Sequence, residues 1–319
     1  MEVPPLDVTH SSVSVGHQKM TTRRRSRTFR RLLPIYLFIL PGMALFLLWT
    51  LYPMLDALVM SFFQWNPNPA ATSPFNGIGN YTQALSDPIF WQAFGNVLYY
   101  TVVTVIGQMV LGLAVALLLN RKLFALGFFR ALYYLPVVTS WVVVSVVFAF
   151  LFSAPSGPVD WFLGDVLHLI PDTQLWLGST TLALPTLMIL GIWKGVGWNM
   201  VIFLAGLQSI PAELYEAARV DGANSWTLFR FITLPLLRPV ITFVTVILTM
   251  GGFGTFIPMF ILTQGGPLHT TETLLTYAYT NAFQTFDFGY AAAITYIFAI
   301  FVILLAIVQI RVMQRKVEY

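Results

Sequence analysis

Long uninterrupted runs of apolar residues alternate along this chain with shorter polar segments. Six of the runs are long enough to cross the hydrocarbon core of a bilayer, which takes about 20 apolar residues in a helix. They cover residues 33–60, 96–119, 133–152, 182–207, 239–262 and 289–310. Because a backbone in lipid must satisfy its own hydrogen bonds, each run is expected to be helical. The pattern predicts an all-α, polytopic membrane protein with about six transmembrane helices.

Composition supports a membrane protein and narrows the kinds of site that the chain can carry. Of the 319 residues, 57% are hydrophobic and only 9% are charged, whereas a soluble domain carries about 25% charged residues. The absence of cysteine excludes a disulfide framework, a thiolate metal site and a cysteine nucleophile. The four histidines, His10, His17, His168 and His269, lie far apart in the sequence. We therefore expect no metal centre and no cofactor.

The basic residues predict how the chain is oriented in the membrane. Cytoplasmic loops of membrane proteins collect Lys and Arg. The segments 61–95, 153–181 and 263–288 contain neither, while 16 of the 17 basic residues lie in the two terminal segments or in the alternate loops. Both termini and the loop between the fourth and fifth runs are therefore expected in the cytoplasm. The excess of basic over acidic residues, 17 against 13, is then explained by topology and by contact with lipid. No nucleic acid partner is expected.

The N-terminal segment divides the chain into two parts. Residues 1–28 are rich in Arg, Ser and Thr and are expected to be a disordered cytoplasmic tail. Residues 29–319 are expected to form the membrane domain. A secretory signal peptide is the alternative for the basic tail and the run that follows it. It is disfavoured because an apolar run of 28 residues is too long, and no small-residue cleavage site follows.

The loop between the fourth and fifth runs carries the most specific motif of the chain. The motif begins at Glu216-Ala217-Ala218, continues to Gly222, and ends at Pro235 with the spacing E-A-A-x3-G-x9-I-x-L-P. Glu-Ala-Ala by itself is common, and an ordinary amphipathic loop is the alternative. The complete spacing, which Asp221 also fits, favours a dedicated function for this loop.

The residues of this loop predict a short helix with a defined end. Ala212 to Val220 are mostly good helix formers, and Pro211 suits a first helical turn. Gly222 suits the left-handed turn that commonly ends a helix. Such a helix, exposed between two transmembrane spans, is predicted to act as a lever that transmits a push from another protein into both spans.

The motif resembles the coupling motif of permease subunits of ATP-binding-cassette importers. Other stretches resemble the carbohydrate-uptake members of that family, which include maltose, glycerol-3-phosphate and oligosaccharide permeases. They lie at Asn80-Tyr81, at Arg130 with Leu135-Pro136, at 203–215, and at 262–267. The last stretch resembles the first of the two paired permeases in such systems. The resemblance implies that Glu216, Ala217, Ala218, Asp221 and Gly222 contact the ATPase.

The resemblance also implies partners and a mechanism. The expected partners are a second permease subunit, a dimer of ATPase subunits, an extracytoplasmic solute-binding protein, membrane lipid and a sugar substrate. Alternating access would move the sugar without changing it covalently. The chain lacks the phosphate-binding pattern G-x-x-x-x-G-K-[ST], so ATP hydrolysis is expected on a separate subunit.

Two polar residues of the fourth run are candidates for the substrate path. Lys194 is the one basic residue inside a span, and an intramembrane charge commonly faces protein or a water-filled path. Snorkelling of its ammonium to the outer surface is an equal alternative. Asn199 lies deeper and is the better candidate for a sugar hydroxyl. Gly251, Gly252 and Gly254 give the fifth run unusual flexibility, which could widen the path or allow close helix packing.

Two other classes of protein compete with this hypothesis. An ion-coupled secondary transporter should carry intramembrane acidic residues and an internal repeat, but only Asp56 is acidic within a run and no repeat is visible. An enzyme would need a catalytic constellation. Asp160, Asp165 and Asp172 share one loop, yet solvated loop carboxylates are the default, so no catalytic residue is predicted. The sequence does not identify the sugar.

Overall fold

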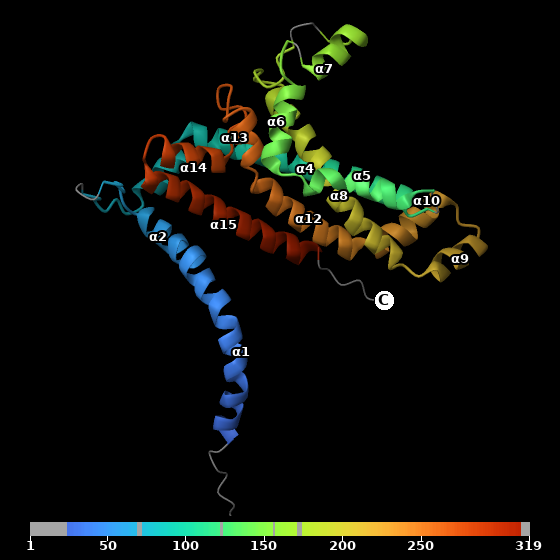
Figure 1. Ribbon diagram of the computed structural model, residues 1–319, viewed down its shortest axis with the longest axis horizontal. Coiled ribbons are helices and arrows are strands. Elements are labelled where there is room, and N and C mark those ends of the chain that lie inside the picture. Colours follow the sequence, from blue (N-terminus) through green and yellow to red (C-terminus); the bar gives the residue numbers. More distant parts are fainter. Residues whose placement is uncertain (1–23, 69–71, 122–123, 156, 171–173, 314–319) are drawn as a thin grey trace, which may run out of the picture. The chain divides into compact units, whose positions relative to one another are not determined.

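The computed structural model describes residues 24–68, 72–121, 124–155, 157–170 and 174–313. Within these ranges all regular structure is helical, and the only extended pairing is an isolated antiparallel bridge between Phe63 and Phe75. This confirms the all-α prediction (Figure 1). The chain divides into two compact units, Met1–Asp56 and Ala57–Tyr319. Most of the predicted tail, 1–28, lies outside the described residues, although α1 begins within it, at Arg24.

The first unit is built on one long helical segment. It consists of α1 (Arg24–Phe46), a π-helical turn η1 (Leu47–Leu51) and the start of α2 (Tyr52–Met60). Residues Tyr36–Met60 are long and apolar enough to cross a membrane, and no residue in the most apolar part of this segment is buried by the chain itself. The first predicted span is confirmed, and its apolar surface is left for lipid or for another protein.

The second unit is organised around four long helices, α4, α8, α12 and α15. Their bounds, in that order, are Pro88–Leu119, Ala183–Gln208, Arg238–Phe253 and Phe288–Met313. Helix α8 runs along α4, while α12 packs against both α4 and α15 (Figure 1). The shorter elements connect them: α3 (Gly79–Ser86), α7 (Pro158–Asp160), η2 (Trp161–Val166), α13 (Ile257–Leu262) and α14 (Leu274–Phe283).

Five segments of the described chain could each cross a membrane as one span, and a sixth span is broken. The predicted run at 133–152 is two helices, α5 (Leu126–Val138) and α6 (Trp141–Leu151), bent by 96° at the break between them. The predicted start of the second span, residue 96, is also too late. Helix α4 begins at Pro88, because Asp87 accepts a hydrogen bond from the N–H of Ile89 at 2.8 Å and so caps the helix.

The most extensive packing lies between α4 and α8 and depends on glycine. A Cβ atom placed on Gly112 would come within 2.6 Å of the Cβ atom of Asn199, and one on Gly107 would come within 2.6 Å of the Ile192 side chain. Small residues let transmembrane helices approach this closely and so gain van der Waals contact. One buried apolar cluster lies where α4, α8 and α12 meet: Ala116, Leu119, Met200, Phe203, Leu204, Leu207, Leu237 and Val244.

A carboxylate ties three helices together where α4 begins. The Asp87 carboxylate accepts hydrogen bonds from the hydroxyl groups of Tyr277 on α14, at 2.5 Å, and of Tyr290 on α15, at 2.6 Å. Burial alone would raise the pKa of Asp87, but the hydrogen bonds from the two tyrosines and from backbone N–H groups hold it below its ordinary value. This Asp87 clamp fixes the short helix α14 to the two long helices beside it.

Candidate functional site

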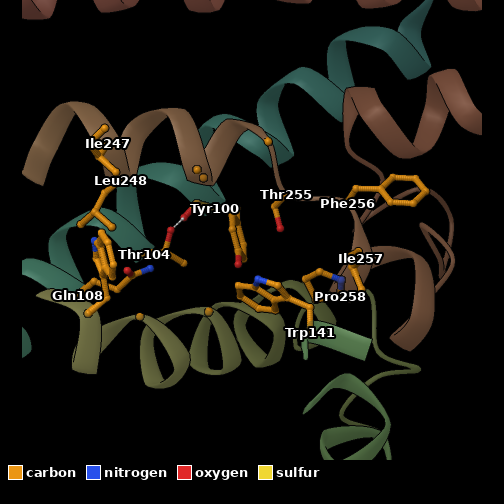
Figure 2. A pocket seen from close by; sticks show the side chains of 16 residues that line it. Tyr100, Thr104, Gln108, Trp141, Ile247, Leu248, Thr255, Phe256, Ile257 and Pro258 are labelled. Carbon is orange, nitrogen blue, oxygen red and sulfur yellow. Dashed lines mark hydrogen bonds between the residues drawn. The ribbon is translucent and has the colours of Figure 1, made fainter. Parts of the chain in front are cut away.

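A cavity of about 600 Å³ lies among the spanning helices of the second unit. Its wall comes from α4, α8, the first residue of α6, and the region where α12 ends and α13 begins (Figure 2). The residues that line it are Tyr100, Thr104, Gln108, Trp141, Gly191, Gly195, Trp198, Ile247, Leu248, Gly251, Gly252, Gly254, Thr255, Phe256, Ile257 and Pro258. Two interrupted spans therefore meet at this cavity.

Glycines make room for the polar side chains of the cavity. A Cβ atom on Gly191 would lie 2.3 Å from the hydroxyl oxygen of Tyr100, and one on Gly195 would lie 1.9 Å from Oε1 of Gln108. Real Cβ atoms do not come so close, so a side chain at either position of α8 would displace Tyr100 or Gln108 from its place in the wall. Gly251 on the opposite wall has nothing within 4 Å of such an atom and faces open space. The glycine-rich stretch thus lines the cavity.

The lining is aromatic and polar, and none of its residues carries a charge. Tyr100, Thr104 and Gln108 recur every four residues and lie on one face of α4. Figure 2 shows the Tyr100 ring pointing toward Trp141. In the described part of the chain, no acceptor faces the side-chain nitrogen of Gln108 or the indole nitrogen of Trp141. The wall therefore offers neutral hydrogen-bonding groups and flat apolar surfaces.

Asn199, predicted to contact substrate, supports the cavity from behind. It is completely buried, and its side-chain nitrogen donates to Oε1 of Gln108 at 3.2 Å and to the backbone carbonyl of Gly195 at 2.9 Å. It is absent from the lining, and one hydrogen bond separates it from the cavity. The sequence argument missed the polar residues of the lining, Gln108 among them, although the four-residue spacing of Tyr100, Thr104 and Gln108 was a signal for them.

Lys194, the other predicted path residue, is also buried and outside the lining. Its Nζ atom donates to the backbone carbonyls of Pro136 at 2.7 Å, Thr139 at 2.6 Å and Val137 at 3.4 Å. These carbonyls lie at the break between α5 and α6. Snorkelling would require the side chain to reach a free surface, and in this structure it does not.

The motif loop forms the short helix that the sequence predicts. Helix α9 (Ala212–Val220) has the predicted bounds, and Pro211 lies one position earlier than expected, at its N-cap. Gly222 has a φ of +84°, which confirms the left-handed turn. The N–H of Gly222 donates to the carbonyl of Arg219 at 3.0 Å, and that of Ala223 donates to the carbonyl of Ala218 at 2.9 Å. This pair of bonds is a Schellman motif.

The rest of the loop re-enters the spanning region through α10 (Ser225–Leu228), the π-helical turn η3 (Phe229–Thr233) and α11 (Leu234–Leu236). The hydroxyl groups of Tyr215 on α9 and Thr233 in η3 are hydrogen-bonded at 3.0 Å. This bond connects the exposed helix to the element that leads into α12.

The motif residues present an open surface. Glu216, Ala217, Asp221 and Gly222 are exposed and Ala218 is half-buried. Large apolar side chains stand beside them: Val220 is 88% exposed, Phe231 68% and Trp226 64%. Soluble surfaces rarely expose such side chains together unless another protein covers them. The geometry therefore suits a docking surface. No cluster of three or more His, Asp or Glu able to hold a metal occurs in the described residues.

Comparison with known proteins agrees with these observations. Residues 108–318 match the family described as "Binding-protein-dependent transport system inner membrane component". The probable ABC transporter permease protein YurN of Bacillus subtilis is 35% identical over 280 residues, which cover 86% of this chain and 94% of YurN. The lactose transport system permease protein LacF of Rhizobium radiobacter is 35% identical over 278 residues, which cover 86% of this chain and 92% of LacF.

A third relative and a solved structure extend the comparison. The arabinooligosaccharides transport system permease protein AraP of Bacillus subtilis is 34% identical over 280 residues, covering 86% of this chain and 87% of AraP. A chain of a bacterial alginate ABC transporter, solved in complex with an alginate pentasaccharide-bound periplasmic protein, shares the fold with a TM-score of 0.79 and 24% identity. The match covers 92% of this chain and 97% of that one. This chain belongs to the family of binding-protein-dependent transport system inner membrane components.

Proposed function

We propose that this chain is the permease subunit of a sugar importer, in which it forms part of the path and a separate ATPase supplies the energy. The observation that carries the proposal is the uncharged, aromatic and polar cavity among the spanning helices. A sugar presents hydroxyl groups and apolar C–H faces. Neutral donors and acceptors beside tryptophan and tyrosine rings match both of these features.

The relatives support the sugar class. LacF is a permease for lactose and AraP one for arabinooligosaccharides, and both align over most of this chain. The cavity agrees with such substrates, because Tyr100, Gln108 and Trp198 can each form a hydrogen bond without a charge. Asn199 would act through Gln108, since its side-chain nitrogen donates to Oε1 of Gln108. Family membership gives no support to the ion-coupled alternative.

Coupling to the ATPase would take place at α9. Glu216, Ala217 and Asp221 lie on an exposed helix that a Schellman turn ends at Gly222. The two alanines leave the backbone accessible to a partner, and Glu216, in the middle of the helix, presents an exposed anion. A push on α9 would travel through the Tyr215–Thr233 hydrogen bond into α12, whose end lines the cavity.

The orientation and the remaining partners complete the proposal. The alternation of basic residues supports an orientation with both termini and α9 in the cytoplasm. A second permease subunit would close the path, two ATPase subunits would bind from the cytoplasm, and a solute-binding protein would deliver sugar from outside. ATP binding would draw the α9 helices of the two permeases together and open the cavity outward.

Uptake by the reconstituted importer tests this function. Proteoliposomes would contain both permeases and the ATPase, with the solute-binding protein outside, ATP inside, and radiolabelled lactose or arabinotriose as probe. We expect uptake only when ATP and the binding protein are both present. Gln108→Met, which removes the polar group and keeps the length of the side chain, should reduce uptake while the complex still assembles. Uptake that is independent of ATP would overturn the proposal.

A further inference from the structure

The break between α5 and α6 leaves backbone carbonyls that need donors. A helix end has four carbonyl groups without an intrahelical partner, and water is absent from the hydrocarbon region. Helix α5 ends at Val138 and α6 begins only at Trp141, after a bend of 96°. Some group must satisfy these carbonyls if the break is to persist inside a membrane.

Lys194 from α8 supplies the donors. An ammonium group has three N–H bonds, and Nζ of Lys194 meets three carbonyl oxygens, two of them at 2.7 Å and 2.6 Å and the third at 3.4 Å. Its positive charge also lies at the carboxyl end of α5, where the helix dipole favours a cation. Each donor of the ammonium therefore has a protein acceptor, which leaves no N–H group for a sugar.

Close contact between α5 and α8 makes this arrangement possible. A Cβ atom on Gly197 would lie 2.0 Å from the backbone carbonyl oxygen of Tyr133. The bare backbone at Gly197 therefore brings α5 against α8, three residues from Lys194. The lysine side chain needs only to pass along this contact to reach the end of α5.

The same ammonium lies against a wall of the cavity. Nζ of Lys194 is 4.9 Å from the centroid of the Trp141 ring, a distance at which a cation is attracted to the face of an indole. Trp141 is the first residue of α6 and lines the cavity. Ser140 accepts a hydrogen bond from the N–H of Val142 at 3.3 Å and so caps this end of α6. Lys194 thus contacts both the break and the aromatic side chain that follows it.

We infer that Lys194 is a positioning residue for the sugar path. It caps α5, holds the break in the third span, and fixes the Trp141 ring as the wall on which the apolar face of a sugar packs. Its influence on the substrate passes through Trp141 rather than through direct contact. The inference rests on the proposed function for the part played by the sugar, whereas the anchoring of α6 can be tested without one.

The anchoring is tested by thiol labelling of the assembled importer. The chain has no cysteine, and Ser145 on α6 is completely buried, with no hydrogen-bond partner for its hydroxyl among the described residues. Ser145→Cys is therefore a mild probe and the only thiol of this chain, so labelling is followed on this subunit after separation from its partners. We expect Lys194→Met to raise the rate of labelling by N-ethylmaleimide about tenfold or more, because α6 opens locally. Lys194→Arg, which keeps a cationic donor, should restore slow labelling.

The matched control for this experiment is Val201→Ala, a truncation of an exposed side chain on the same helix. It should leave the labelling rate unchanged. The anchoring role would be overturned if the Ser145→Cys thiol were labelled at the same rate with and without the Lys194→Met change, in complexes that retain the ATPase. If Lys194→Met prevents assembly, the Lys194→Gln variant decides, because it keeps a neutral donor of similar length.

The positioning role is tested by a double-mutant cycle with Trp141→Ala. The single variants are Lys194→Met and Trp141→Ala. Uptake of radiolabelled lactose or arabinotriose, whichever the unaltered importer accepts, is measured for each of them and for the double variant. We expect each single variant to reduce uptake and the double variant to be no worse than the poorer single, because both changes remove the same wall. Losses that multiply would overturn the inference. Failure of the unaltered importer to take up either sugar would count against the proposed function and leave the labelling result intact.

Discussion

At the scale of single residues, the structure separates side chains that face the cavity from those that support it. Gln108 lines the cavity, while Asn199 holds Gln108 from behind at 3.2 Å. The sequence identified Asn199 because a buried amide in a span needs a partner. It could not show that the partner was another side chain of the same protein, because the α4–α8 contact joins residues 91 positions apart.

The first prediction compares these two amides. Gln108→Met should reduce sugar uptake roughly two- to tenfold, since a net hydrogen bond contributes about 0.5–1.5 kcal/mol. Asn199→Ala should reduce uptake less, because the Gln108 amide is still present to bind the sugar even though one of its supporting hydrogen bonds is lost. Initial uptake rates at saturating sugar, together with the basal ATPase rate, measure both effects. A larger loss for Asn199→Ala, without loss of assembly, would show that Asn199 contacts the sugar itself.

The second prediction concerns Gly222. Its φ of +84° is unfavourable for a residue with a Cβ atom, and no atom within 4 Å would clash with one, so the penalty is purely conformational. Gly222→Val should cost about 1–2 kcal/mol locally, and Gly222→Asn should cost less. Amide hydrogen exchange of α9 measures the difference. Equal protection in Gly222→Val and the unaltered protein would show that the left-handed turn is dispensable.

At the scale of elements, local signals predicted α9 and its end correctly, and the broken third span was missed. Helix α9 is specified by neighbouring residues, from Pro211 to Gly222, so the sequence contains its bounds. The run 133–152 is apolar apart from Pro136, Thr139-Ser140 and Ser145, too few polar residues to predict a bend of 96°. The break is stabilised by Lys194, which is 55 residues from Thr139. Periodicity and hydropathy do not report such a contact. The early start of α4 was missed because Gln92, Gly95 and Asn96 interrupt the apolar pattern near its beginning.

The third prediction tests α9 as the coupling element. Glu216→Lys should weaken binding of the ATPase and reduce uptake, because a cation replaces an exposed anion on the proposed docking surface. Glu213→Lys is the matched control: the charge change is the same, one turn closer to the N-terminus, where the dipole effect on the helix is larger. Co-purification of the ATPase and uptake are measured. A greater loss of ATPase binding for Glu213→Lys would contradict the assignment of Glu216.

The fourth prediction concerns the Asp87 clamp. Because its hydrogen bonds hold the pKa of Asp87 below the ordinary value of 3.8, the carboxylate contributes stability above that pH, which is lost as pH falls through the lower value. Burial and the hydrogen bond to Asp87 raise the pKa of Tyr277 to about 12, so the contribution of its neutral form is complete below pH 10 and is lost as pH rises through 12.

The contribution of the clamp to stability should therefore be independent of pH between about 4 and 10. Asp87→Asn should lower the melting temperature of the importer throughout this window. Combining it with Tyr277→Phe should lower the melting temperature little further, because both changes affect the same hydrogen bond between Tyr277 and Asp87. Thermal unfolding at several pH values measures this. Full additivity of the two variants would show that the carboxylate and the hydroxyl act independently.

At the scale of the whole molecule, the chain is a membrane subunit whose proposed energy source and substrate delivery lie on other proteins. Hydropathy and basic residues sufficed to predict its class, because the bilayer imposes strong rules on composition. The cavity could not be predicted, since it is assembled from α4, α6, α8, α12 and α13.

The fifth prediction follows from this division of labour. The purified subunit alone in liposomes should neither hydrolyse ATP nor accumulate lactose or arabinotriose, whatever proton or sodium gradient is applied. Adding the second permease, the ATPase and the binding protein should restore both activities. The release of phosphate from ATP and the uptake of sugar are measured in parallel. Accumulation by the lone subunit under an ion gradient would favour a secondary transporter.

The uncharged lining of the cavity has an electrical consequence. Moving one elementary charge through the membrane potential is worth about 2.3 kcal/mol per 100 mV. The side chains that line the cavity carry no formal charge, so their rearrangement around a neutral sugar transfers none across the field. Passage along this wall should then proceed at the same rate in polarised and depolarised membranes, and the importer would keep working in a cell whose membrane voltage has collapsed while ATP remains.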